Sequence, residues 1–136
     1  MAEKVGTLVP NGLAAPGGHY SHAAVCGDIV VTAGQLGIRP DGSHTSGLGF
    51  EDQVRQAMAN VLAALAAAGA GPSDILKVTA YIVGVENWPR FNAIYAEMMG
   101  AARPARTVVP VPELHYGYLV EIDAMAVRRS AREDGP

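Results

Sequence analysis

Apolar side chains recur at helical spacing over residues 50–68, which indicates an amphipathic helix. Its predicted buried stripe consists of Val54, Met58, Val61, Leu62 and Leu65. Alanines give this segment a high helix propensity, and Gly69 is typical of a helix end. Asn87 is a favourable N-cap for a second helix, which we predict to run to about Met99.

Shorter apolar runs predict five β-strands, over residues 23–26, 29–33, 75–83, 105–109 and 119–128. Gly27 and Asp28 lie between the first two strands and indicate a hairpin. The third strand alternates, which predicts one face made of Leu76, Val78, Ala80 and Ile82. The order of the elements predicts an α/β sandwich, a single mixed sheet with both helices on one face.

The face of the sheet without helices is predicted to be chemically mixed. The last strand would place there Leu119, Glu121, Asp123, Met125 and Val127, near Lys77 and Tyr81 of the middle strand. Such a face is too apolar for water and too charged for the core of a monomer. We therefore expect a subunit interface with polar clefts.

The composition predicts one compact domain over residues 1–129, followed by a polar tail at residues 130–136. The net charge of −3 disfavours nucleic acid as the main partner. The sequence contains neither a signal-peptide core nor an apolar run long enough to span a membrane, and Cys26 is its only cysteine. These features favour a protein of the reducing cytoplasm.

Arg106 and Glu121 are the most informative polar residues, because each lies in a segment predicted as a buried strand. An unpaired buried ion loses several kcal/mol or more of solvation, so the two charges either neutralise each other or await a ligand. The arginine fork matches a carboxylate, and a half-buried glutamate can exchange protons near neutral pH. The residues alone leave open a pocket for a small carboxylic acid or a structural ion pair of Arg106 with Glu121 or Asp123.

The four histidines show no ligand spacing typical of a metal site, and no cofactor motif is present, so we expect neither a metal nor an organic cofactor. His115 is either a proton shuttle or a solvated loop histidine.

Several motifs, taken in order, resemble the RidA/YjgF family of reactive-intermediate deaminases. They are GGHY, VVTAGQ, the helix EDQVRQAMANVLAALAAAG, SDILKVTAYI, FNAIYAEMMG, RPAR and LVEIDAMAVRR, and together they cover residues 16–129. The resemblance implies a fold like that of a small trimeric chorismate mutase, with a pocket in each cleft between neighbouring subunits of a homotrimer. It also implies cofactor-independent hydrolysis of enamines and imines, such as 2-aminoacrylate and 2-iminopropionate, to 2-keto acids and ammonia.

The resemblance also assigns roles to residues. Arg106 matches the arginine that binds the substrate carboxylate, and Glu121 matches the glutamate that orients or activates water. Tyr20 matches a pocket-lining tyrosine, and Asn92 matches a pocket-side asparagine. The expected mechanism is attack on the imine carbon by a water that Glu121 deprotonates, while Arg106 holds the carboxylate.

Two departures indicate a branch that differs from the best-studied members. Ala33 stands where they often have serine, and Val108 stands in the pocket wall where they have cysteine. The loop PVPELHYGYL is distinctive and is expected to bring His115, Tyr116 and Tyr118 near the site. Two other functions stay open: a non-catalytic protein that senses a metabolite, and an endoribonuclease or translation inhibitor, as some relatives are labelled.

Overall fold

The structure is a computed structural model, and it describes residues 4–129. The tail predicted at residues 130–136 lies outside the described residues. The strands are β1 Gly6–Leu8, β2 Ala23–Cys26, β3 Ile29–Thr32, β4 Ile75–Val83, β5 Ala105–Val111 and β6 Val120–Val127. The helices are α1 Phe50–Ala67 and α2 Trp88–Met99, with short 3-10 turns η1 Pro72–Asp74, η2 Val85–Asn87 and η3 His115–Gly117. None of the helices within residues 4–129 is long and apolar enough to cross a membrane.

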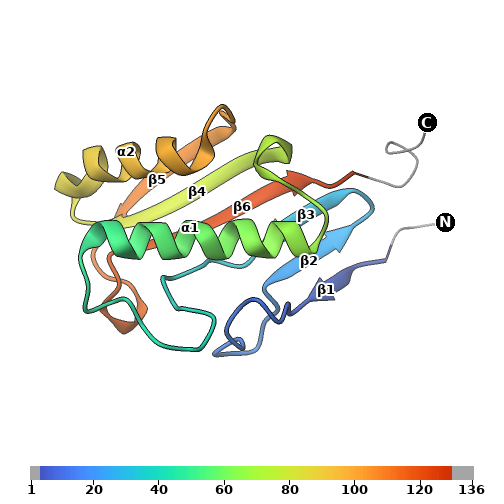
Figure 1. Cartoon of the computed structure of the whole chain (residues 1–136), viewed down its shortest axis with the longest axis horizontal. Helices are drawn as coiled ribbons and strands as arrows, with labels where there is room; N and C mark the ends of the chain where they lie inside the picture. The colour runs from blue at the N-terminus through green and yellow to red at the C-terminus, as the bar shows by residue number, and fades with distance from the viewer. Residues whose placement is uncertain (1–3, 130–136) are drawn as a thin grey trace.

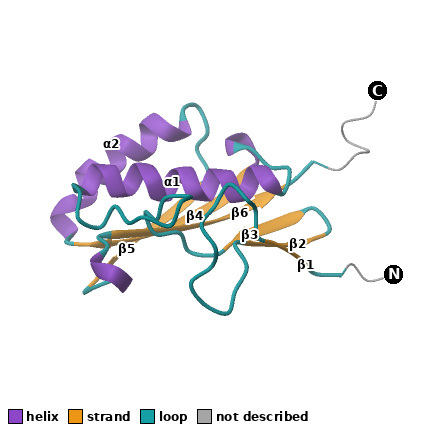
Figure 2. Cartoon of the chain, turned by 60° about the horizontal axis from the view of Figure 1, so that its bottom comes forward, coloured by secondary structure: helices purple, strands orange, loops and turns teal. Residues whose placement is uncertain are grey.

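The six strands form one mixed sheet in the order β1-β2-β3-β6-β4-β5. β4 and β5 pair in parallel, and every other neighbouring pair is antiparallel. The parallel pair needs a crossover, which α2 provides. Both helices pack on the same face of the sheet (Figures 1 and 2). The predicted fold class, a mixed sheet with two helices on one face, is therefore confirmed.

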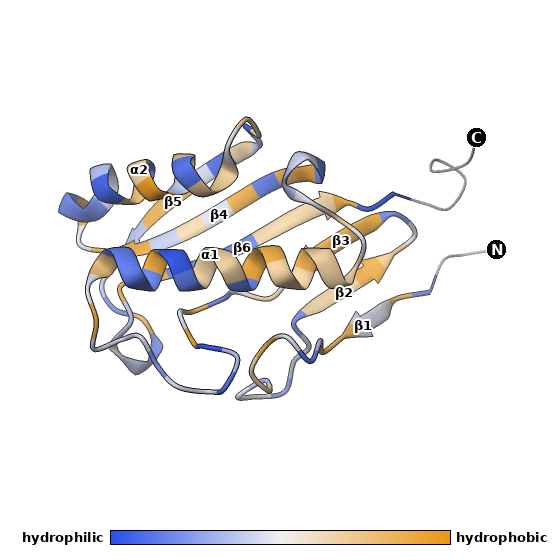
Figure 3. Ribbon diagram, in the orientation of Figure 1, coloured by the Kyte–Doolittle hydropathy of each residue, from blue (hydrophilic) through white to orange (hydrophobic). Residues whose placement is uncertain are grey.

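The hydrophobic core lies between the helices and the sheet. Four members of the predicted α1 stripe, Val54, Met58, Val61 and Leu65, are fully buried, and Leu62 packs against the core as a partly buried side chain. Hydrophilic residues of α1 concentrate in its N-terminal turns, while its C-terminal half is apolar (Figure 3). The central strands contribute every second residue, among them Val78, Ala80, Ile82, Val120 and Ile122. This alternation leaves the intervening side chains on the opposite, open face.

Two strand predictions need correction. The short strand β1 was not predicted, because three residues are too few to show a periodic pattern. Leu76 was expected on the buried face with Val78, but it is 48% exposed and Ile75 is buried instead. A β-bulge between the pairings of Ile75 and Lys77 with β6 causes this, since the extra residue reverses the alternation.

The open face of the sheet is mixed, as predicted. Tyr81 pairs with Glu121, and Thr79 pairs with Asp123, so these side chains share the face away from the helices. Three apolar side chains on neighbouring strands are also exposed, Ile29 by 44%, Val31 by 37% and Met125 by 41%. Exposed apolar side chains that gather on one face are typical of an interaction surface.

Candidate functional site

Glu121 is the central acidic residue of the open face. The register of β6 turns its side chain away from the helices, because Val120 and Ile122 on either side are fully buried in the core. Its carboxylate is half-buried and accepts no hydrogen bond from any residue in the described part of the chain. Burial raises the pKa of Glu121, the charge of Asp123 raises it further, and nearby His115 opposes the shift. A carboxyl group in this state can both accept and donate protons closer to neutral pH.

A bulge beside Gly34 makes room for the Glu121 carboxylate. β3 pairs with β6 at Val31 and Met125, and the pairing resumes as an isolated bridge between Gln35 and Ile122. Between these two pairings one segment advances by four residues and the other by three, so one extra residue bulges out. A Cβ at position 34 would lie 2.7 Å from Glu121 Oε2 and 3.0 Å from its Cδ. Only glycine therefore leaves space for this orientation of the glutamate.

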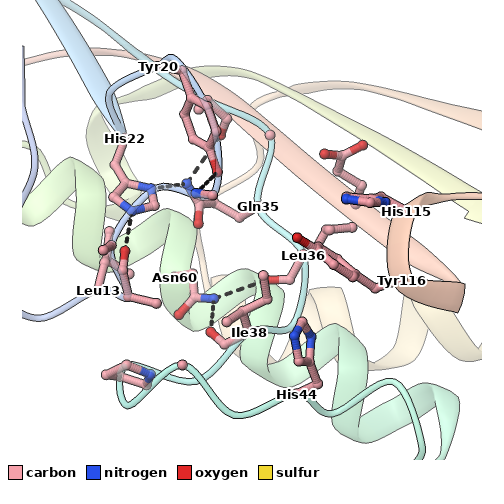
Figure 4. A pocket seen from close by; sticks show the side chains of 18 of the residues that line it. Leu13, Tyr20, His22, Gln35, Leu36, Ile38, His44, Asn60, His115 and Tyr116 are labelled. Atoms are coloured by element: carbon pink, nitrogen blue, oxygen red, sulfur yellow. Dashed lines mark hydrogen bonds between the residues drawn. The ribbon is translucent and has the colours of Figure 1, made fainter.

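Glu121 lines a pocket of about 690 Å³. Three loop segments form most of it: the loop before β2, the long connection from β3 to α1, and η3 before β6; Asn60 of α1 and Glu121 of β6 complete the lining. The side chains around the pocket include Leu13, Tyr20, His22, Gln35, Leu36, Ile38, His44, Asn60, His115 and Tyr116 (Figure 4). The size is typical of pockets that bind small molecules.

One wall of the pocket is held by buried hydrogen bonds. His22 Nε2 donates to the carbonyl of Ala14 at 2.6 Å, so His22 Nδ1 accepts from Gln35 Nε2 at 3.1 Å. The backbone of Gln35 also exchanges both of its hydrogen bonds with Ile122. Both nitrogens of His22 are thereby occupied, which indicates a structural role for this histidine.

A cluster of aromatic rings borders the opposite side of the pocket. The Tyr116 ring centroid lies 3.6 Å from that of His115 and 4.8 Å from that of His44, and Figure 4 shows Tyr116 between them. His44 Nδ1 shares a 2.9 Å hydrogen bond with the buried hydroxyl of Tyr118, which also accepts from the backbone N–H of Thr45. Tyr116 has a φ of 60°, a left-handed conformation that is unusual for a tyrosine.

Arg106 lies elsewhere, and its predicted burial is wrong. β5 is an edge strand, and Arg106 is exposed on it. Its partner across the parallel pair is the buried Val78, so the side chain points to the helix-covered face of the sheet. There the guanidinium carbon lies 5.0 Å from the Tyr95 ring centroid and 5.6 Å from that of Phe91, both on α2.

The alternative of an ion pair between Arg106 and Glu121 or Asp123 is also wrong within one chain. Arg106 points to the helix side of the sheet, and both acids point to the open side. Within residues 4–129, the guanidinium has neither a salt bridge nor a hydrogen bond. The arginine therefore presents unused donors at the edge of the sheet.

The predicted site residues thus fall into two groups. Tyr20, His115 and Glu121 line the pocket, together with Ala33. Arg106, Val108 and Asn92 do not; the first two belong to β5, and Asn92 is exposed on α2. No residue set within positions 4–129 groups three or more histidines, cysteines or acidic side chains so that they could hold a metal ion.

Sequence reasoning did not assign roles to Gly34, Gln35, His22, His44 or Asn60. Gly34 and Gln35 belong to the TAGQ motif, so the motif could have pointed to them. His44 meets Tyr118 across 74 positions of the chain. A pattern of neighbouring residues carries no signal for such a contact.

The family described as endoribonuclease L-PSP matches residues 12–128, which is most of the chain. The chain belongs to this family. This result confirms the resemblance to the RidA/YjgF family, since the solved structure of the YjgF gene product from E. coli matches with a TM-score of 0.84 and 30% identity, covering 91% of this chain and 99% of that one.

Other members of the family are similar over the same region. A RutC family protein of Pyrococcus horikoshii is 37% identical over 113 residues, which cover 83% of this chain and 90% of the relative. A 2-iminobutanoate/2-iminopropanoate deaminase of Dermatophagoides farinae is 33% identical, over 82% of this chain and 88% of the relative. E. coli TdcF, solved with bound serine, matches with a TM-score of 0.84 and 29% identity, over 91% of this chain and 99% of that one.

Proposed function

We propose that this protein is a cofactor-independent hydrolase that converts enamine and imine carboxylates, of the 2-aminoacrylate and 2-iminopropionate type, to 2-keto acids and ammonia. The observation that carries the proposal is Glu121, a half-buried carboxylate with a raised pKa that faces an open pocket and accepts no hydrogen bond from residues 4–129. The similarity to a 2-iminobutanoate/2-iminopropanoate deaminase supports it.

The pocket needs a cation for the substrate carboxylate, and we propose that Arg106 of a second copy supplies it. Arg106 and Glu121 point to opposite faces of the sheet, so one chain cannot bring both to one ligand. A head-to-tail ring of copies would place the β5 edge of one chain against the pocket of the next. The exposed apolar side chains of Ile29, Val31 and Met125 favour an assembly through the open face. We propose a homotrimer, the assembly that the family resemblance implies.

In the proposed reaction, the guanidinium of Arg106 binds the carboxylate of the substrate through two parallel hydrogen bonds. This fixes the imine carbon above a water molecule held by Glu121. The water attacks the carbon of the protonated imine while Glu121 takes one water proton, which gives a neutral carbinolamine. Glu121 then returns this proton to the nitrogen, the C–N bond breaks as the C=O bond forms, and the hydroxyl proton leaves with the ammonia as ammonium. Positioning and general base catalysis of about 10²–10⁴-fold suffice, because imines hydrolyse readily.

Two other functions are alternatives to hydrolysis: a metabolite sensor and an endoribonuclease. A sensor would bind the keto acid without accelerating the hydrolysis. Cleavage of RNA, which the family description suggests, is disfavoured by the net charge of −3 and by the acidic side chain in the pocket, since both repel phosphates.

The first experiment measures how fast the protein hydrolyses 2-aminoacrylate that a pyridoxal-phosphate dehydratase generates in the same solution. Semicarbazide traps the remaining imine, so hydrolysis by the protein lowers the amount of semicarbazone. We expect a rate above the spontaneous one, and a Glu121→Gln variant should abolish most of it. A rate equal to the spontaneous one, with keto acid bound in the pocket, would favour the sensor.

A mixing experiment tests the shared site. Glu121→Gln and Arg106→Ala chains are each expected to be nearly inactive, but unfolding and refolding them together should restore activity. Random mixing leaves about a quarter of the interfaces with both intact side chains, if each site takes Glu121 from one copy and Arg106 from its neighbour. Wild-type protein refolded in the same way is the control. No recovery after verified mixing would mean that the two residues do not serve one site.

A further inference from the structure

The pocket beside Glu121 is larger than a short imino acid requires. Its volume of about 690 Å³ corresponds to that of roughly 20 liquid water molecules. 2-Iminopropionate has only a methyl group as its side chain. If Glu121 acts on the imine carbon, the part of the pocket that Arg106 of the second copy does not fill is left for a longer substituent.

The side of the pocket away from His115 offers few free polar groups. Leu13 and Ile38 line it, and Figure 4 shows both across the pocket from His115, whereas Leu36 lies beside Tyr116. Asn60 also lines this side, but its amide nitrogen donates to the carbonyls of Leu36 and Ile38, and its oxygen accepts from Gln56. The amide of Asn60 is thus hydrogen-bonded within the protein, so Leu13 and Ile38 offer the apolar surface here, and the exposed Asp41 is the other charged residue besides Glu121 that lines the pocket.

Aromatic rings border the other side of the pocket. Tyr116 stacks on His115 at 3.6 Å between ring centroids and approaches His44 at 4.8 Å, while the hydrogen bond from His44 to Tyr118 fixes the second imidazole. The hydroxyl of Tyr116 lies on the side of the loop at Gly17, where an added Cβ would be 3.6 Å away. Ring faces of this kind favour a planar apolar group packed against them.

We propose that the substrate is a 2-imino acid with a large apolar side chain, preferably an aromatic one, which occupies the Tyr116 pocket. The Tyr116 pocket is the space lined by Leu13, Leu36, Ile38, His44 and Tyr116. This inference rests on the proposed function, since it assigns the side chain of the same substrate. Glu121 and a carboxylate-binding Arg106 act on the backbone atoms common to all imino acids, so the Tyr116 pocket is the part that distinguishes them. The reaction remains hydrolysis of C=N to C=O by water with release of ammonia.

The test compares imines that an amino-acid oxidase generates from phenylalanine and from alanine, with semicarbazide as the trap. We expect kcat/KM for the phenylalanine-derived imine to be at least about tenfold higher, because apolar pockets discriminate by about 10–200-fold for each methylene. Binding of the stable products gives a second readout, and phenylpyruvate should raise the melting temperature more than pyruvate does at equal concentration.

Four variants test whether the preference depends on the Tyr116 pocket. Ile38→Phe adds a ring inside it and should lower the ratio of the two kcat/KM values about tenfold or more. Val85→Phe adds the same ring at an exposed position outside the pocket and should leave the ratio unchanged. Tyr116→Asn removes the ring but tolerates the left-handed backbone, so it should also lower the ratio, whereas Tyr116→Phe should keep it.

The outcomes separate the two claims. Hydrolysis of the alanine-derived imine with equal or higher kcat/KM would overturn the side-chain inference and leave the proposed function standing. Acceleration of neither imine would contradict the proposed function, and the inference with it. A ratio that Ile38→Phe and Val85→Phe change equally would also overturn the assignment to the Tyr116 pocket.

Discussion

Glu121 and Arg106 occupy two regions that differ in almost every physical respect. Glu121 is half-buried on the inner strand β6, at a bulge that fits its carboxylate, and loops from three parts of the chain surround it. Arg106 is exposed on the edge strand β5, on the opposite face, with only the rings of Tyr95 and Phe91 beside it. The side chains around Glu121 all come from one chain, whereas Arg106 presents its charge outward at the edge of the sheet.

The difference is consistent with the proposal that two copies share one site. A chain that enclosed both charges would bury an ion pair, which costs desolvation and fills the pocket that a ligand needs. Two charges on opposite faces of the sheet avoid this, because the pocket stays open to a ligand and the exposed arginine stays solvated. The following changes test the two regions separately, from the largest expected effect to the smallest.

Glu121→Gln should lower kcat by about 10²–10⁴-fold, which is the usual contribution of general acid–base catalysis. Glutamine keeps the shape of the side chain beside Gly34 but cannot take a proton from water. KM should change little, because the carboxylate of the substrate binds elsewhere. Steady-state kinetics on the imine substrate measure both constants. An unchanged kcat, with hydrolysis shown to be the slow step, would assign the base to another residue, with His115 the next candidate.

Arg106→Ala should cost about 2–5 kcal/mol of transition-state binding, the range for removing one member of a hydrogen-bonded charge pair. Arg106→Lys keeps the charge but loses the two-pronged geometry, and it should also lose most activity. The measurement is kcat/KM of both variants, with the assembly state checked by light scattering. Normal assembly and normal activity of Arg106→Ala would show that the arginine is not the carboxylate anchor.

The fold could be predicted because its signals are local. The α1 stripe, the Gly27-Asp28 turn and the alternation of β6 each follow from neighbouring residues, and each is present in the structure. The errors have local causes as well. The bulge at Leu76 changes the alternation without any sequence mark, and β1 is too short to show a period.

The site was only partly predictable, because its geometry depends on strand order. A charged residue inside an apolar run indicates burial only if the strand is central, and β5 lies at the edge. Arg106 and Glu121 are separated by fifteen positions, yet their faces are set by registers to β4 that the sequence does not display. The contacts of Tyr118 with His44 and Thr45 join residues more than seventy positions apart and could not be anticipated.

Gly34→Ala tests the space reserved for Glu121. The new Cβ would lie 2.7 Å from Glu121 Oε2, so the carboxylate must move. A displacement of about 1 Å at a catalytic group can cost up to about 100-fold in rate. Gly47→Ala is the matched control, because nothing lies within 4 Å of a Cβ there. Adding Gly34→Ala to Glu121→Gln should produce no further loss, and an additive loss would mean that Gly34 acts independently of the glutamate.

Tyr95 tests what holds Arg106 in place. Tyr95→Leu removes the ring beneath the guanidinium and should lower kcat/KM by about two- to fivefold, the equivalent of an exposed cation–π contact of about 0.5–1 kcal/mol. Tyr95→Phe keeps the ring and removes a buried hydroxyl that has no hydrogen-bond partner within the described chain, so activity should be retained. A larger loss in Tyr95→Phe than in Tyr95→Leu would instead assign the function to the hydroxyl.

The smallest effect concerns stability and follows from the burial of Glu121. Its pKa is raised in the folded state, so the folded protein binds the proton more tightly than the unfolded chain does. The free energy of unfolding is then highest below the ordinary glutamate pKa of 4.5, and it decreases as the pH rises through the raised value. Glu121→Gln removes this decrease. The melting temperature of the variant should equal that of the wild type in acid and exceed it at neutral pH.

Glu97→Gln provides a control of opposite sign. A hydrogen bond from Arg55, together with its charge, lowers the pKa of Glu97, so the ionised form stabilises the folded state at pH values above the ordinary glutamate pKa. Replacing Glu97 should therefore slightly lower the melting temperature at neutral pH and leave it unchanged in acid, since an exposed pair contributes little. Melting curves from acid to neutral pH for the three proteins measure both trends. If the gap between Glu121→Gln and the wild type stays constant across this range, burial does not oppose the charge of Glu121, and the pocket must hydrate its carboxylate as well as bulk water does.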